Sequence, residues 1–491
     1  MNEEMKIRIG QRLSVGFDGA TIPQEYEELI KNYKIGNVIL FRRNVESYDQ
    51  LKALCADLRE LILKETGHEP YIMIDEECGR VSRLAHVATP TPSAMAIGAT
   101  GDVQNAYQIG HLIGEELRAV GVNFNLAPVL DCLTNPAAPH GNRCFAVEPE
   151  KTAAFGNAYL QGLQEMGVLA CAKHFPGQGD TAVDSHLGLP VVDKPEEAVW
   201  NTELVSFQSA VKAGIKGIMS AHVVFPAFEP EHIPGTVSRN VITGLIREKM
   251  GFQGIILSDG MEMNAVMDMF GIEEGTRKAL AAGVDIALIC HSAKQAQSTC
   301  EYLYNALESG NLDADEVEAR YQHIVDCKKD LLPPEGGKGQ FGSETQKRIA
   351  KKVMRDAVGV CYQPQGKPLP RIDSETVFLG VAARAESLAS DDVPLDAAVE
   401  CAKAFAARRI GLEEEPPAGT KTAVVFLNKH PDQQKAIEAA ARLAAQGIQV
   451  VGVSMNVPYY FEGLPENVWH VEAWQYDELA LESLIDYLQK P

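Results

Sequence analysis

The chain alternates short apolar segments with longer amphipathic ones. Continuous apolar runs such as residues 214–223 (GIKGIMSAHV) and 251–260 (GFQGIILSDG) are typical of strands buried on both faces of a parallel sheet. Eight such strands are predicted, over Arg12–Gly19, Asn37–Phe41, Tyr71–Glu77, Asn123–Asp131, Val168–Phe175, Gly214–Val223, Gly254–Gly260 and Val284–Cys290.

Helical patterns separate these strands, and many of them end at a glycine, which is a frequent helix terminator. The clearest helical patterns cover Tyr48–Glu65, Val103–Val120, Lys151–Met166, Thr202–Ala213, Arg239–Met250 and Ala293–Glu308. Eight strand–helix units over about 330 residues favour a (β/α)₈ TIM-type barrel over a shorter doubly wound sheet.

The pattern changes after residue 330. A segment rich in proline and glycine, LLPPEGGKGQFG, indicates a linker over residues 331–345, between a catalytic barrel domain (1–330) and a C-terminal α/β domain (346–491). The second domain is predicted to hold strands near Thr376–Val381, Thr422–Leu427, Gln449–Val453 and Val468–Glu472, with helices near Glu344–Val358, Pro431–Ala445 and Asp477–Gln489. No motif in this second domain indicates a chemical function. We therefore expect the domain to pack against the barrel and to modulate access to its active site.

Composition and charge restrict the classes of molecule that the protein is expected to bind. The 491 residues carry a formal net charge of −22, which disfavours nucleic acid and anionic membranes as partners. Met1–Ile9 lacks the apolar core of a secretory signal, and no apolar run reaches the roughly 18 residues of a membrane span. The ten cysteines never form a CxxC pair. We therefore expect a cytoplasmic protein with reduced thiols.

Polar side chains gather where the predicted strands end. A single aspartate at a strand end is often only a helix N-cap, but charged or imidazole groups on neighbouring strands indicate an active site at the C-terminal face of the barrel. The groups at these ends are Asp75-Glu76-Glu77 with Arg80 and Arg83, Asp131 with Asn142-Arg143, Lys173-His174, His222, Ser258-Asp259 and His291.

The segment Lys173–Pro190, KHFPGQGDTAVDSHLGLP, carries the most information. Lys173 and His174 leave a strand into a turn whose glycines permit positive φ. Asp184 stands two residues before His186, so its carboxylate can fix the imidazole tautomer and raise its basicity. This is the form of a general acid/base pair, and we expect the loop to close over substrate.

Together these motifs resemble glycoside hydrolase family 3, in its β-N-acetylglucosaminidase (NagZ-like) branch. The resemblance covers most of the first 330 residues. It rests on the KHFPGxGxxxxDSHxxxP pattern, on DEECGRVSRL at Asp75–Leu84, on Asn142-Arg143-Cys144-Phe145 and on Leu257-Ser258-Asp259. Three positions depart from the branch: Gln178 replaces a histidine, Gly260 an aspartate and Cys78 a glycine.

The resemblance implies a role for each matching residue. Asp259 would attack the anomeric carbon, and His186, supported by Asp184, would protonate the leaving oxygen and then activate water. The sugar hydroxyls would be bound by Asp75, Lys173, His174 and Arg143, with Arg83 supporting the pocket and His222 compatible with a place in it. No metal and no cofactor is implied.

The sequence thus predicts a retaining exo-β-N-acetylglucosaminidase acting on carbohydrates with terminal β-GlcNAc, such as cell-wall turnover fragments. Four other interpretations stay open. A metal-dependent hydrolase would use His174, His186, His222, Asp131 and Asp259, and a substrate-assisted glycosidase would use Asp75-Glu76. The others are a non-catalytic sugar-binding protein and, within the family, a β-N-acetylglucosaminide phosphorylase or β-glucosidase.

Overall fold

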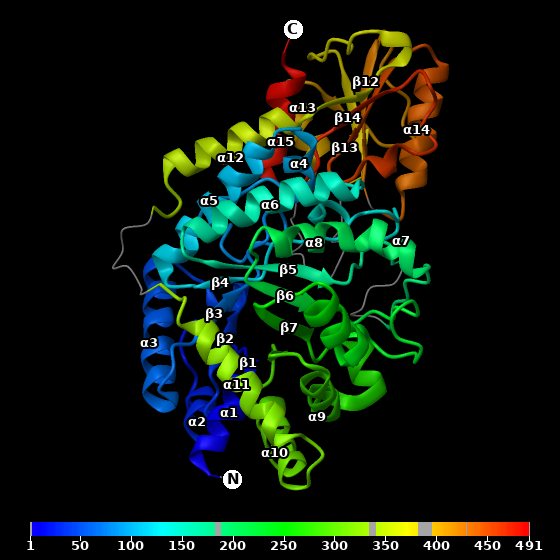
Figure 1. Ribbon diagram of the computed structural model, residues 1–491. Helices are drawn as coiled ribbons and strands as arrows, with labels where there is room; N and C mark the ends of the chain where they lie inside the picture. The colour runs from blue at the N-terminus through cyan, green and yellow to red at the C-terminus, as the bar shows by residue number, and fades with distance from the viewer. Residues whose placement is uncertain (1, 182–187, 333–339, 382–394, 429, 491) are drawn as a thin grey trace.

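A computed structural model describes residues 2–181, 188–332, 340–381, 395–428 and 430–490. It has two lobes (Figure 1), with a β-barrel in the larger lobe and an open sheet in the smaller. The first and last described residues lie at opposite ends of the molecule.

Eight parallel strands close the barrel in sequence order, each paired with the next and β8 with β1. The predicted TIM-type barrel is therefore confirmed. Its strands are β1 (Leu13–Val15), β2 (Asn37–Leu40), β3 (Tyr71–Ile74), β4 (Phe124–Asn125), β5 (Leu169–Phe175), β6 (Gly217–Ser220), β7 (Ile255–Gly260) and β8 (Ile286–Ile289).

Helices surround the barrel. They comprise α1 (Glu3–Gln11), α2 (Gln24–Tyr33), α3 (Tyr48–Thr66), α4 (Ala94–Ala99), α5 (Val103–Val120), α6 (Pro149–Glu165), α7 (Glu196–Asn201), α8 (Glu203–Lys212), the π-helix η4 (Asn240–Lys249), α9 (Asn264–Ala282), α10 (Ala293–Glu308) and α11 (Ala314–Lys328). Short 3₁₀ turns add η1 (Arg42–Asn44), η2 (Gly141–Arg143) and η3 (Gly235–Val237).

Side chains that point inward from the strands fill the barrel. Met73, Phe124, Met219 and Leu257 belong to one buried cluster, and Ile324 of α11 joins it. The barrel is thus a packed core, and space for a ligand is confined to its rim.

The fourth strand is much shorter than predicted. β4 covers only Phe124 and Asn125, whereas the apolar pattern predicted Asn123–Asp131. Pro128 has no N–H to give to a ladder, and pairing beyond the strand is irregular. Val129 bridges to Lys173, and the Leu126 N–H still donates to the Ile74 carbonyl oxygen. The chain from residue 126 onward therefore leaves the regular sheet at the barrel rim.

The second lobe is a six-stranded sheet in the order β11-β10-β12-β13-β14-β9, parallel except for β9. Its strands are β9 (Gly359–Tyr362), β10 (Val377–Gly380), β11 (Arg408–Arg409), β12 (Thr422–Leu427), β13 (Gln449–Ser454) and β14 (Trp469–Glu472). Its helices are α12 (Glu344–Ala357), α13 (Ala397–Ala404), α14 (Gln433–Ala445) and α15 (Glu478–Leu488), with 3₁₀ turns η5 (Pro364–Gly366) and η6 (Pro458–Phe461). The predicted α/β fold of this lobe is confirmed, although the sequence pattern missed the edge strands β9 and β11.

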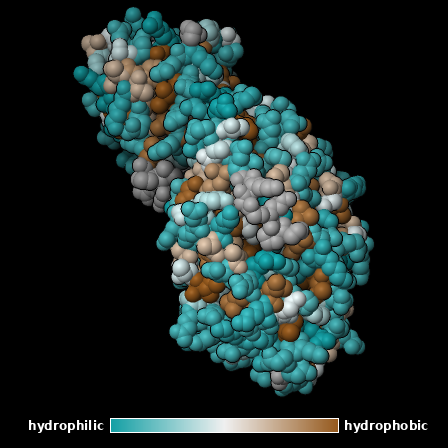
Figure 2. All heavy atoms as spheres, turned by 90° about the vertical axis from the view of Figure 1, so that its left-hand side faces the viewer, coloured by the Kyte–Doolittle hydropathy of each residue, from teal (hydrophilic) through white to brown (hydrophobic). Residues whose placement is uncertain are grey.

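The face of the molecule turned to the viewer in Figure 2 is mostly hydrophilic on both lobes, with hydrophobic side chains scattered between polar ones. Across the described part of the chain, no helix combines the length and the apolar character needed to cross a membrane.

Helices α5 and α6 approach each other closely because glycines lie at their contact. A Cβ atom on Gly110 would lie 2.2 Å from the Tyr159 carbonyl oxygen, and one on Gly162 would lie 2.2 Å from that of Tyr107. Backbone carbonyls cannot move aside as a flexible side chain can, so both positions exclude any side chain.

We predict that Gly162→Ala lowers the free energy of unfolding by about 1–3 kcal/mol, because the added methyl group forces the two helices apart. Gly244→Ala is the matched control, since its nearest neighbour would be the Arg239 carbonyl oxygen at 3.9 Å. The control should be neutral or stabilising by up to about 1 kcal/mol. Urea denaturation of both variants tests this, and equal stabilities would contradict the packing argument.

Candidate active site

A cavity of about 610 Å³ opens at the C-terminal ends of the barrel strands. Each of the strands β2 to β8, or the residue directly after it, contributes to its wall, as shown by Phe41, Asp75, Leu126, Lys173, Met219, Asp259 and Cys290. Catalytic residues of such barrels lie at this face, so the cavity is the candidate active site.

One wall of the cavity is a network of four charges. Lys173 Nζ lies 2.6 Å from Asp75 Oδ1 and 2.6 Å from Glu77 Oε1. Arg143 binds the Glu77 carboxylate with two hydrogen bonds, from Nε at 2.8 Å and from Nη2 at 2.7 Å. The side chains of Lys173 and Glu77 are only 2% and 4% exposed, so these ion pairs lie in a low-dielectric environment.

The network fixes the ionisation of its members. Burial alone would raise the pKa of Glu77, but Arg143 and Lys173 hold that pKa well below its usual range. Burial opposes the charge of Lys173, and the neighbouring Asp75 and Glu77 nevertheless raise its pKa. Glu77 is therefore ionised, and Lys173 and Arg143 are protonated, at neutral pH.

Asp131 and His174 form a second buried pair beside this network. His174 Nδ1 donates to Asp131 Oδ2 at 2.7 Å, and the backbone N–H of Gln178 donates to Oδ1 at 2.7 Å. Although burial raises the pKa of Asp131, these partners and His140 together lower it to about 2. The ionised carboxylate thus fixes the tautomer of His174 and the direction of its ring.

Asp259 is the last residue but one of β7, and its side chain is partly buried on the cavity wall. The N–H of Gly260 donates to Asp259 Oδ1 at 2.7 Å, which restricts rotation of the carboxylate. An anchored carboxylate on the wall of such a cavity has the properties of a nucleophile or of an electrostatic stabiliser.

His222 does not line the cavity, contrary to the prediction that it has a place in the pocket. It is fully buried, with Nε2 at 3.0 Å from the Gly260 carbonyl oxygen and Nδ1 at 2.8 Å from Thr236 Oγ1. His222 follows the end of β6 by two residues, and its ring contacts the backbone directly after Asp259. We therefore expect it to position the end of β7.

The other predicted residues fall into two groups. Arg83 lines the cavity, and its backbone N–H donates to the buried Glu76 carboxylate at 2.7 Å. Asp184 and His186 lie outside the described residues, so their predicted roles stay predictions. The turn leading toward them shows why glycine is needed, since a Cβ on Gly179 would lie 1.8 Å from the Cys132 carbonyl oxygen.

Sequence reasoning did not assign roles to Glu77 and His140, and it left Asp131 out of the substrate-binding set. Glu77 follows Asp75 by two residues, and this alternation could have marked it as a second carboxylate on the same side. His140 stands in the long loop after β4, where no local pattern indicates that it packs against His174.

The second lobe contacts the loops that carry these charges. Asn142 Nδ2 and Ser93 Oγ both donate to the Trp474 carbonyl oxygen, at 2.9 and 3.0 Å. Gln475 Oε1 accepts from the Ser93 N–H at 2.5 Å. Trp474 has a positive φ of 60°, and its N–H donates to the buried Glu472 carboxylate at 2.8 Å. The turn after β14 is thus fixed within its own lobe and holds the residue next to Arg143.

Fold and cavity together are those of a (β/α)₈-barrel enzyme. Residues 5–327 match the family model described as "Glycosyl hydrolase family 3 N terminal domain". The chain belongs to this family, so the resemblance found in the sequence is confirmed, as is the expectation, at the level of the family, of a glycoside hydrolase.

Curated relatives and solved structures agree. The chain is 35% identical to "Beta-hexosaminidase A" of Pseudoalteromonas piscicida, over 63% of this chain and 56% of that protein. It is 36% identical to "Beta-hexosaminidase" of Thioalkalivibrio sulfidiphilus, over 58% of this chain and 82% of the relative. The structure of a family 3 β-N-acetylglucosaminidase from Paenibacillus sp. str. FPU-7 matches 99% of this chain and 96% of its own, with TM-score 0.89 and 29% identity.

We predict that Asn142→Ala raises KM for a glycoside substrate severalfold and changes kcat less, because the loop that carries Arg143 loses its anchor. The rise in KM corresponds to a loss of about 1 kcal/mol of binding free energy. Tyr459→Phe is the control, since it removes a different contact between the lobes, from Tyr459 to the Leu133 carbonyl oxygen at 3.3 Å. If both variants have the same KM as the wild type, Trp474 does not position the site.

Proposed function

We propose that the protein is a retaining exo-β-N-acetylglucosaminidase with Asp259 as its nucleophile. The observation that carries the proposal is the content of the cavity, which the anchored Asp259 carboxylate lines together with the ion-pair network of Asp75, Lys173, Glu77 and Arg143. The β-hexosaminidase and β-N-acetylglucosaminidase names of the relatives support the choice of sugar.

The charged wall is suited to bind sugar hydroxyls. Asp75 would accept hydrogen bonds from two neighbouring hydroxyls, while Lys173 and Arg143 would donate to their oxygens. Because these side chains are already held by one another, little conformational entropy is lost when the sugar binds. His174 Nε2, the ring nitrogen that does not contact Asp131, would add a further contact to the same sugar ring.

The reaction then proceeds in two displacements. Asp259 attacks the anomeric carbon and forms a glycosyl ester, while the bond to the leaving oxygen breaks and His186 gives that oxygen its proton. In the second step His186 takes a proton from water, whose oxygen displaces Asp259 and restores the carboxylate. Asp184 would hold the imidazole and stabilise its charged form, and the net configuration is retained.

Substrates in this proposal are GlcNAc-terminated oligosaccharides, including fragments from cell-wall recycling, and the site of action is the cytoplasm. The state of the cysteines supports the second point. All ten are free thiols and eight of them are buried. A protein with many free thiols suits a reducing compartment.

We predict that the wild-type protein releases nitrophenol from nitrophenyl β-GlcNAc. The Asp259→Asn variant should have a kcat for this substrate that is lower by about 10³-fold or more. Glu262→Gln is the matched control, because Glu262 also lines the cavity and has no role in the reaction proposed. A nearly normal rate for Asp259→Asn would overturn the mechanism, and a preference for the β-glucose substrate would overturn the specificity.

Product analysis separates hydrolysis from phosphorolysis. A histidine acid/base places no second anion near the acceptor, so phosphate could in principle take the place of water. We predict free GlcNAc as the product, at the same rate with and without about 10 mM phosphate. Formation of GlcNAc 1-phosphate, detected by mass spectrometry, would instead assign the chain as a phosphorylase.

A further inference from the structure

His140 has no part in the reaction proposed above, although it lines the same cavity. Its side chain is 4% exposed, and its Nδ1 atom has no hydrogen-bond partner in the described part of the chain. Its Nε2 atom lies 3.8 Å from Asp131 Oδ2, which is too long for a hydrogen bond.

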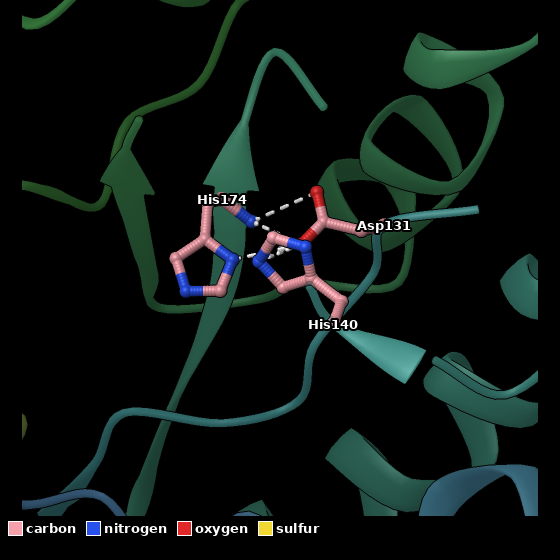
Figure 3. Close-up of side chains that lie close together, drawn as sticks. All are labelled: Asp131, His140 and His174. Atoms are coloured by element: carbon pink, nitrogen blue, oxygen red, sulfur yellow. Dashed lines mark hydrogen bonds and ion pairs between the residues drawn. The ribbon is translucent and has the colours of Figure 1, made fainter. Parts of the chain in front are cut away.

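Three metal-binding side chains converge at this place. Asp131, His140 and His174 each offer one ligand atom, and these atoms all lie within 4.8 Å of one another (Figure 3). All three residues are buried, with Asp131 and His140 in the loop after β4 and His174 in β5. Two imidazoles and a carboxylate are the donor set of many zinc sites that keep one position open.

The spacing of the three groups fits a small ion. Zinc bonds of about 2.0–2.2 Å in a tetrahedral site separate the ligand atoms by about 3.3 Å. Asp131 Oδ2 lies 2.7 Å from His174 Nδ1 and 3.8 Å from His140 Nε2, so the observed distances lie on either side of that value. The remaining pair, His140 and His174, lies within 4.8 Å, so side-chain shifts alone would bring the set into coordination.

The surroundings support the same role. The backbone N–H groups of His174 and Gln178 both donate to the Asp131 carboxylate, which orients it as outer-shell contacts orient metal ligands.

We propose that Asp131, His140 and His174 form a binding site for a divalent transition-metal ion such as Zn²⁺, with the open coordination position facing the sugar cavity. The bound ion would replace the proton that His174 shares with Asp131 and would occupy space beside the sugar. It would therefore act as a reversible inhibitor that competes with substrate, whereas turnover by Asp259 needs no metal. This effect on turnover rests on the proposed function, but the site itself does not.

Metal binding is tested first without any enzyme assay. The chelator-treated protein is titrated with Co²⁺, whose visible absorption reports nitrogen and oxygen coordination, and with Zn²⁺ by calorimetry. We expect one ion per chain in wild type and affinity at least about tenfold lower in His140→Leu and His140→Gln, because one ligand is lost. Thermal melting checks that both variants are folded.

His291→Leu is the matched control, since His291 also lines the cavity but lies outside the cluster. It should bind the ion as wild type does. No stoichiometric binding to wild type, equal binding by the His140 variants, or a loss caused by His291→Leu would each overturn the site.

Inhibition is tested separately, with Zn²⁺ added to the assay of the chelator-treated protein. We expect Zn²⁺ to raise the apparent KM, EDTA to reverse the effect, and His140→Gln to need at least about tenfold more Zn²⁺. Binding without inhibition would overturn the competition with substrate. If wild type hydrolyses no glycoside at all, the proposed function fails, while the Co²⁺ titration still decides the metal site.

Discussion

The buried carboxylate of Glu77 is the interaction on which the active site depends. It accepts from Lys173 on one side and from Arg143 on the other, and Lys173 in turn holds Asp75. Removing one member of such a buried set leaves another charge without compensation, at a cost of about 3–5 kcal/mol. The network therefore arranges groups from two separate loops and from strand β5 as one rigid surface, which is what recognition of a sugar by many hydroxyls requires.

The barrel alone does not provide this order. Its strands end early at β3 and β4, so Glu77 and Arg143 lie on long connections and not on the sheet. These connections gain support from the second lobe, where the turn at Trp474 and Gln475 holds Asn142 and Ser93. The second lobe thus contributes to the site through the backbone, which explains why no catalytic motif is visible in its sequence.

The sequence was sufficient to predict the barrel, because continuous apolar strands and helices that end at glycine are local signals. It also led us to expect Asp75, Lys173, Arg143 and Asp259 at one face of the barrel, and all four line the cavity there, while their roles stay predictions. It failed where contacts are distant in the chain: His222, just beyond the end of β6, turns toward the Gly260 carbonyl. Likewise the approach of His140 to His174 depends on how a loop of the fourth unit folds back, which no residue pattern encodes.

The central claim is that Asp259 forms a covalent bond to the sugar. Its most direct test is mass spectrometry of the intact protein after reaction with a fluorinated β-GlcNAc analogue that slows the second displacement, followed by peptide mapping. The account predicts one added sugar per chain, on the peptide that contains Asp259 and absent from Asp259→Asn. A sugar on another residue, or full turnover of a β-GlcNAc substrate with retained configuration and no covalent adduct, would contradict it.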